Sequence, residues 1–293
     1  MDFSELSHQQ EIRKSLNKIL SEKCSPEKLE KFDSNFKHDE DLYKFLATNG
    51  YLGLGINEKF NGSGEDLYDL GILFECLGFY AAPLSLTGCL VDVAQTLQKF
   101  SINDKHQSIV SSITQGEIYT SAILEPLNQD PENPITTAVF EDNKIIINGS
   151  KYLSEISSLA KGILISASSN KGVILALVNA DDVQLTQLTS TANSPLFKVE
   201  LENIVIENSD VIHQEGRGLE ALRYLLQTNM VMRSYMALGV TQKMTSLVAS
   251  YTSEREQFGR VIGTFQAVSH RAADCFIELE CLRLVNQQAS ANL

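Results

Sequence analysis

Apolar residues recur every three or four positions through the first 118 residues, a spacing that predicts amphipathic helices. We expect Ser7 to cap the first helix, because Gln10 follows three residues later as in a capping box. A second helix is expected to begin at Pro26, since proline fits the first helical position. Further helices are expected at residues 39–48, 66–82, 90–100 and 104–116. Asn49-Gly50 is expected to end the first of these four.

The pattern changes near Tyr119, where short β-branched runs replace the helical spacing. Asp142-Asn143 and Asn170-Lys171-Gly172 supply turns between the runs. Strands are therefore expected at residues 119–126, 135–153, 161–169, 171–180 and 196–206. This part of the chain is predicted to form a β domain.

The order of the elements predicts an N-terminal all-α domain in residues 1–118, a middle β domain in residues 119–213 and a C-terminal α domain in residues 214–293. Two long helices, expected at 218–253 and 264–291, carry wide apolar faces that the pair cannot cover by itself. We therefore expect a partner subunit or a further C-terminal segment to cover the rest.

The formal net charge of −13 argues against a nucleic-acid backbone or an anionic membrane surface as the main partner. The five cysteines are scattered, form no CxxC pair and are expected to be reduced and mostly buried. The N-terminus has no secretory signal pattern, and no apolar run is long enough to span a membrane. A cytoplasmic protein is expected.

The segment "YTSEREQFGRVIGTFQAV", residues 251–268, joins the two long helical patterns. Its residues could form a plain helix–helix corner, with Phe258 in the core and Arg255 paired to a neighbouring glutamate. They could also form a recess in which Arg255 binds a phosphate, Gln257 and Gln266 offer amide hydrogen bonds, and Phe258 packs against a flat ring. The second arrangement suits a dinucleotide.

This segment closely resembles the Y-x-x-x-R-x-x-F-G-x-x-[IL]-x-x-x-Q signature of the acyl-CoA dehydrogenases, which are FAD flavoproteins. "NEKFNGSG", "ILEP", "IIINGSKYL" and "QEGRGLEAL" resemble further motifs of the family, in the family's order. The resemblance covers the whole chain. It implies a multidomain fold with an N-terminal helical domain, a middle β-barrel-like domain and a C-terminal helical domain whose bundle is incomplete in this chain.

By this resemblance Arg255, Gln257, Phe258 and Gln266 would hold the ADP half of FAD, and no metal is implied. The family normally binds that half across a dimer interface, with the flavin seated mainly in the other subunit. The resemblance therefore implies a homo- or hetero-oligomer with an acyl-CoA dehydrogenase paralogue. It also implies an acyl-CoA substrate and an external electron acceptor.

The sequence departs from the family where the isoalloxazine ring would bind. Leu124 replaces the Thr or Ser before Glu-Pro and has no hydroxyl for the polar edge of the ring. Leu153, Ser154 and Glu155 replace the aromatic, Ile and Thr/Ser run, and a carboxylate is unfavourable beside a reduced flavin. A shift of register by one residue would place the Ser154 hydroxyl at the ring instead.

The catalytic base is missing as well. Removal of an α-proton beside a thioester carbonyl, with hydride leaving the β-carbon, needs a poised carboxylate. Most family members carry that Glu beyond the last residue of this sequence, and a minority carry it on the first long helix, where Asn229 and Met230 stand here. Neither residue is a base, so the catalytic residue is unknown. Glu215 and Glu220 lie nearby and are expected to be solvated or to cap the helix.

Three functions remain open. The favoured hypothesis is a non-catalytic or FAD-sharing subunit of a heteromeric enzyme that desaturates an acyl-CoA thioester at the α,β position, an oxidoreductase of fatty acid or lipid metabolism. The alternatives are a truncated or divergent homomeric acyl-CoA dehydrogenase, and a non-enzymatic scaffold related to these enzymes.

Overall fold

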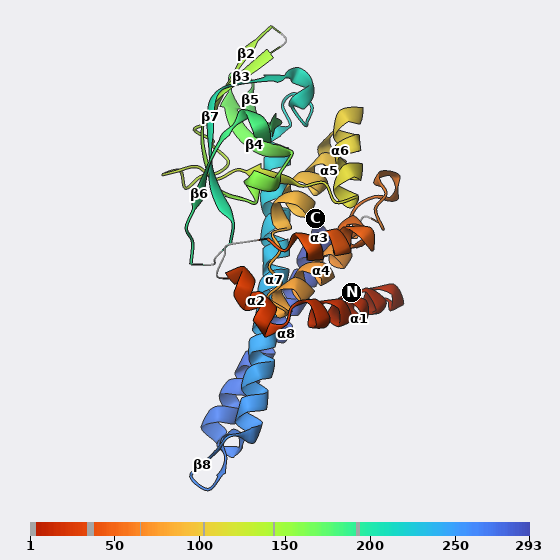
Figure 1. The fold of residues 1–293 in the computed structure, drawn as a ribbon, viewed down its shortest axis with the longest axis vertical. Helices are drawn as coiled ribbons and strands as arrows, with labels where there is room; N and C mark the ends of the chain where they lie inside the picture. Colours follow the sequence, from red (N-terminus) through yellow and green to blue (C-terminus); the bar gives the residue numbers. More distant parts are fainter. Residues whose placement is uncertain (1–3, 34–37, 65, 102, 143, 192–193) are drawn as a thin grey trace. The chain divides into compact units, whose positions relative to one another are not determined.

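The computed structural model describes residues 4–33, 38–64, 66–101, 103–142, 144–191 and 194–293 (Figure 1). The chain forms two compact units. The helical unit contains residues 1–29, 67–82 and 231–293, and the sheet unit contains residues 30–66 and 83–230.

The helical unit is built from α1 (Ser7–Lys23), α4 (Leu67–Phe79), the part of α7 (Gly218–Glu254) from residue 231 onward, and α8 (Gln266–Asn292). Helices α4 and α7 approach each other closely, because glycine stands at both contact points. A Cβ on Gly78 would lie 2.1 Å from the Met236 carbonyl oxygen, and one on Gly239 would lie 1.9 Å from the Glu75 carbonyl oxygen. No larger residue fits at either position without moving a helix.

The sheet unit holds a seven-stranded sheet with β1 (Tyr119–Ala122), β2 (Thr137–Glu141), β3 (Lys144–Glu155), β4 (Gly162–Ser169), β5 (Gly172–Asn179), β6 (Gln184–Leu188) and β7 (Leu196–Glu207). The strand order is β1-β4-β2-β3-β7-β6, and β5 pairs with β4. Strands β1 and β4 are parallel, whereas β3 and β7 form a long antiparallel pair. Alternate residues of these strands, such as Ile145, Ile163 and Val199, form the buried core.

The remaining helices precede the sheet in the chain: α2 (Pro26–Asp33), α3 (Glu40–Thr48), α5 (Thr96–Phe100), α6 (Asp104–Thr114), the π-helix η3 (Thr87–Gln95), and the 3₁₀ turns η1 (Tyr51–Gly53) and η2 (Glu58–Phe60). The first part of α7, up to Met230, belongs to the sheet unit. Helical N- and C-terminal regions, with a central curled sheet between them in the sequence, confirm the predicted fold class.

Three local predictions were wrong. The first helix is capped at Leu6 and not at Ser7, because the Gln9 side chain turns back to accept the Leu6 N–H at 2.9 Å. Strand β6 was missed, since its sequence QLTQL is half polar and it lies at the edge of the sheet. The helix expected from residue 90 begins earlier, as the π-helix η3. The division into three domains at residues 118 and 213 stays a prediction.

The two long helices leave several large apolar side chains exposed, among them Met244, Leu247, Tyr251, Phe276 and Ile277. This agrees with the prediction that the pair does not cover its own apolar faces. The five cysteines are free thiols, of which three are buried and Cys275 and Cys281 are exposed. Among the described residues, no helix combines the length and the apolarity needed to cross a membrane.

Candidate functional site

The joint between α7 and α8 is a β-hairpin at the end of both helices (Figure 1). Strand β8 (Glu256–Gln257) pairs with β9 (Arg260–Val261), so only two residues form the turn. Phe258 and Gly259 both have positive φ, 54° and 78°, as a type I′ hairpin turn requires. The 3₁₀ turn η7 (Ile262–Thr264) then leads into α8.

Phe258 is held in a conformation that a bulky residue rarely adopts. Its side chain is 93% exposed, which argues against the alternative of a plain corner with Phe258 in the core. The ring meets the Phe265 ring edge-on, with centroids 6.3 Å apart, and the Arg260 guanidinium lies 4.0 Å from the centroid of Phe265. Strained residues of this kind gather at ligand-binding positions.

The polar residues of the hairpin are available for a ligand. In the described part of the chain the exposed Arg255 guanidinium makes no hydrogen bond or ion pair, so the predicted pairing with a neighbouring glutamate is absent. Gln257 donates to the adjacent Glu256 carbonyl at 2.7 Å. Gln266 is the first residue of α8, and the N–H groups of a first helical turn have no acceptor within the helix. One short connection therefore carries all four predicted cofactor-binding residues.

A buried ion pair links the two segments where a flavin ring would lie. Lys151 Nζ on β3 donates to Glu125 Oε1 at 2.8 Å, to Ser166 Oγ at 3.0 Å and to the Ile123 carbonyl at 3.4 Å. The Lys151 side chain is fully buried, and that of Glu125 is almost so. The Tyr152 N–H donates to the Leu124 carbonyl at 2.8 Å, which joins the same segments along the main chain.

The surroundings of this pair shift the pKa values of both residues. Burial lowers the pKa of Lys151 to about 8, although hydrogen bonding and attraction to Glu125 oppose that shift. Burial would raise the pKa of Glu125, but hydrogen bonds from Lys151, Thr136, Asn128 and the Ile135 N–H lower it to about 2. Glu125 is therefore a fixed carboxylate that accepts bonds from four groups, and it is no proton acceptor.

A β-bulge redirects the side chains that follow Lys151. Lys151 is opposite Val199 and Ser154 is opposite Phe197, so β3 has one residue more than β7 between these pairs. Leu153 in the bulge has a φ of 58° and is 41% exposed, whereas Ser154 is buried. The Ser154 hydroxyl donates to the Ser121 carbonyl at 2.7 Å. The alternative register, with that hydroxyl facing a ring, has no support here.

The base position that the family resemblance implies within this sequence, Asn229, lies on the first part of α7. Asn229 donates from Nδ2 to Asp92 Oδ1 at 2.7 Å, and Asp92 was not recognised in the sequence. A single acid inside the apolar run "CLVDVA" was the signal that could have found it. Glu220 pairs with Arg217 and Glu215 with Lys171, both at the surface, which confirms that these two are solvated carboxylates.

The residues present fit one half of FAD and do not fit the other. An unpaired arginine, two amides, an exposed aromatic ring and a helix start suit a pyrophosphate and its nucleoside. At the ring position Leu124 is an exposed aliphatic side chain and Glu155 adds a carboxylate. An amide at Asn229 accepts no proton at neutral pH.

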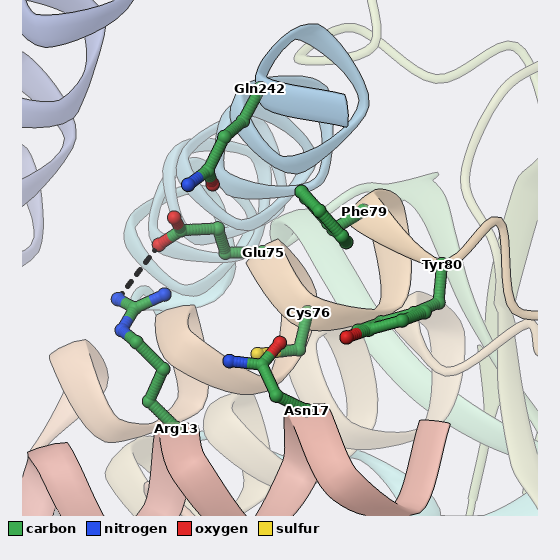
Figure 2. Close-up of a pocket in the computed structure, with 7 residues that line it drawn as sticks. All are labelled: Arg13, Asn17, Glu75, Cys76, Phe79, Tyr80 and Gln242. Carbon is green, nitrogen blue, oxygen red and sulfur yellow. Dashed lines mark hydrogen bonds and ion pairs between the residues drawn. The ribbon is translucent and has the colours of Figure 1, made fainter. Parts of the chain in front are cut away.

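A separate cavity of about 270 Å³ lies in the helical unit between α1, α4 and α7 (Figure 2). Its buried acid, Glu75, accepts from Arg13 Nη2 at 2.9 Å and from Arg283 Nη1 at 2.7 Å. Burial raises the pKa of the Cys76 thiol to about 12, which makes the thiol a poor nucleophile. Glu75 is ion-paired with two arginines, and Cys76 is a poor nucleophile. Neither residue is therefore poised for acyl chemistry.

Two family models match the chain. Residues 7–117 match the model described as "Acyl-CoA dehydrogenase, N-terminal domain", and residues 216–293 match "Acyl-CoA dehydrogenase, C-terminal domain". The chain is 27% identical over 296 residues to acyl-CoA dehydrogenase FadE27 of Mycobacterium tuberculosis, covering 99% of this chain and 77% of that protein. It is 24% identical over 296 residues to the mitochondrial short/branched chain specific acyl-CoA dehydrogenase of Bos taurus, covering 95% and 67%.

Solved structures are similar over nearly the whole chain. A chain of the ChsE4–ChsE5 complex from Mycobacterium tuberculosis superposes with a TM-score of 0.91 at 25% identity, covering 99% of this chain and 79% of that chain. A variant of the Tcur3481–Tcur3483 steroid ACAD superposes with a TM-score of 0.89 at 28% identity, covering 97% and 77%. Both of these structures are named for two polypeptides.

Proposed function

Because this chain belongs to the acyl-CoA dehydrogenase family, whose members are FAD-dependent oxidoreductases, we propose that it is the non-catalytic, FAD-sharing subunit of a heteromeric acyl-CoA dehydrogenase. In this assignment Arg255, Gln257, Phe258 and Gln266 hold the ADP half of the cofactor. A paralogous partner supplies the ring pocket and the catalytic carboxylate. The similarity to the two-polypeptide ChsE4–ChsE5 and Tcur3481–Tcur3483 complexes supports this division of labour.

The observation that carries the proposal is the contrast at the two halves of the cofactor site. Asn229 occupies the base position and gives its amide to Asp92, so this chain offers no proton acceptor there. The hairpin instead keeps Arg255 without a partner among the described residues and Phe258 strained and exposed. A bulky residue at positive φ is costly to keep, and such residues cluster at functional positions.

The reaction of the complex is α,β-desaturation of an acyl-CoA thioester. FAD, when bound, supplies the hydride acceptor, and electrons then pass to an external acceptor. This chain's own contribution is to hold the pyrophosphate by the charge of Arg255 and by the N–H groups at the start of α8. Phe258 would cover one face of the nucleoside and exclude water from it.

The visible absorption spectrum tests this assignment. The chain is purified alone and again after co-expression with the products of its neighbouring genes. Flavin absorbance only in the co-purified complex is the expected result. Flavin bound by the chain alone would favour a divergent homomeric enzyme, and flavin in neither sample would favour a scaffold.

The hairpin is tested in the same complex with Arg255→Ala. Loss of the pyrophosphate contact is expected to lower flavin affinity about tenfold to a hundredfold, as for other charge-assisted hydrogen bonds. Arg271→Ala, which removes an exposed arginine from α8, serves as the matched control. Normal flavin content in the Arg255→Ala complex would refute the assignment of this hairpin.

A further inference from the structure

Two positions at which this chain departs from its family, Ser154 and Asn229, are joined by hydrogen bonds within the sheet unit. Asp92 accepts hydrogen bonds from Asn229 Nδ2 at 2.7 Å and from Ser121 Oγ at 2.5 Å. The Ser121 carbonyl in turn accepts from Ser154 Oγ at 2.7 Å, and Ser154 Oγ accepts from Ser157 Oγ at 2.7 Å. One connected chain of hydrogen bonds therefore runs from the base position on α7 to the ring segment after β3.

Asp92 sits where four elements meet. It lies in η3, a π-helix whose nine residues are all buried, and its own exposed fraction is 4%. A Cβ on Gly88 would lie 2.5 Å from Thr120 Oγ1, so η3 packs closely against β1. Thr120 Oγ1 donates to the Glu155 carbonyl at 2.7 Å, which fastens β1 to the end of β3. π-Helical turns are uncommon and gather at functional positions.

We propose that Asp92 is a positioning residue. It ties together the residues of the ring and base region, by which we mean Ser121, Ser154 and Asn229, so that they bind one another and no ligand. Its carboxylate holds the Asn229 amide and the Ser121 hydroxyl, and through Ser121 it fixes Ser154. These are the groups that could otherwise meet the polar edge of a flavin ring or a thioester carbonyl. The region is a hydrogen-bonded joint between η3, β1, β3 and α7, and it takes neither ligand.

This inference rests on the proposed function, since it explains why the chain contributes only the ADP side of the cofactor site. It also relates two of the departures from the family, Ser154 and Asn229, to one buried carboxylate. A buried carboxylate that loses one hydrogen-bond donor is destabilised by the full desolvation of that group, so Asp92, Asn229 and Ser121 constrain one another. We therefore expect them to behave as a unit in mutagenesis.

Urea unfolding of the full chain, without flavin or partner, tests the joint. Asp92→Leu is expected to raise the equilibrium constant for unfolding more than tenfold, because it removes the acceptor of two half-buried donors, Ser121 and Asn229. Asp92→Asn keeps one acceptor oxygen and is expected to recover most of the loss. Equal stability of Asp92→Leu and the wild type would overturn the proposal.

A double-mutant cycle isolates the contact with α7. Asp92→Ala and Asn229→Ala are expected to be coupled by about tenfold in the unfolding constant, about 1.4 kcal/mol. Gln227→Ala, on the exposed side of the same helix, is expected to be additive with Asp92→Ala. Additivity in both cycles would overturn the proposal.

Asn229→Glu distinguishes a closed joint from a site that has merely lost its base. The new carboxylate would face Asp92, so we expect at least a tenfold rise in the unfolding constant and no reduction of a redox dye by acyl-CoA with added FAD. Gln227→Glu controls for the added charge. Dye reduction by the Asn229→Glu chain, or an unchanged unfolding constant, would overturn the inference. Failure of the proposed function would appear separately, as normal flavin content in the Arg255→Ala complex.

Discussion

The hairpin at the end of α7 and the ring and base region of the sheet unit differ in what surrounds their functional side chains. In the hairpin, Arg255 has no partner among the described residues and Phe258 is strained and exposed. In the sheet unit, Lys151, Glu125 and Asp92 are buried and hydrogen-bonded. An exposed cation and a strained, exposed ring suit ligand binding, whereas buried polar groups bonded to one another suit structure. The comparison therefore separates what this chain offers to a partner from what it uses to fold.

The largest effect is expected from Lys151→Met, which leaves the buried Glu125 without its cation. Breaking a buried pair from one side costs about 3–5 kcal/mol. Urea unfolding of the full chain measures this loss. Lys144→Met, an exposed lysine at the start of β3, is the control and is expected to change stability little. Equal effects of the two variants would place the Glu125–Lys151 pair with ordinary surface charges.

The same pair should make the chain sensitive to acid. The pKa of Glu125 is lowered from 4.5 to about 2, so between these values the unfolded chain binds a proton that the folded chain does not. Stability is then present above about pH 4.5 and is lost as pH falls toward 2, by on the order of 2 kcal/mol. Unfolding midpoints measured across this pH range should depend less steeply on pH for Glu125→Gln than for the wild type. Glu202→Gln, which changes an exposed carboxylate on β7, should keep the wild-type slope.

In the hairpin, stability and function are expected to move in opposite directions. Phe258→Asn creates the Asn-Gly pair that type I′ turns favour, so it should stabilise the chain by about 0.5–1 kcal/mol. The same change removes the aromatic ring and should lower the flavin content of the complex. Gly259→Ala is the opposing control and should destabilise the chain. A Cβ at this position would meet no atom within 4 Å, but a φ of 78° is strained for any residue with a side chain. A Phe258→Asn chain that is less stable would show that the ring contributes packing.

The smallest effect on stability is expected from Arg255→Ala. Because the Arg255 guanidinium has no partner in the described residues, its removal should change the free energy of unfolding by less than about 0.5 kcal/mol. Thermal unfolding of the chain alone measures this, beside the flavin content of the complex. A large loss of stability would mean that Arg255 is structural, and the comparison between the two regions would fail there.

Much of the fold was readable because local periodicity reports it. The helices at α3, α7 and α8 and the turn at Asn170-Lys171-Gly172 lie where spacing and turn residues predicted them. Strand β6 escaped because an edge strand with a half-polar sequence has no clear alternation. The capping residue of α1 escaped because Gln9 was as able to turn back as Gln10, and only the packed helix distinguishes them.

The sequence by itself determined the family and the residue type at the base position, Asn229, since both follow from residue types at a given spacing. The assignment of Arg255, Gln257, Phe258 and Gln266 to the cofactor stays a prediction. Only the tertiary structure decided what the altered positions do instead. Asp92 contacts Ser121 and Asn229 across separations of 29 and 137 residues, and no local pattern encodes such a contact. Burial increases the contribution of these hydrogen bonds to stability, because a polar group removed from water is destabilising unless the fold supplies a hydrogen-bond partner.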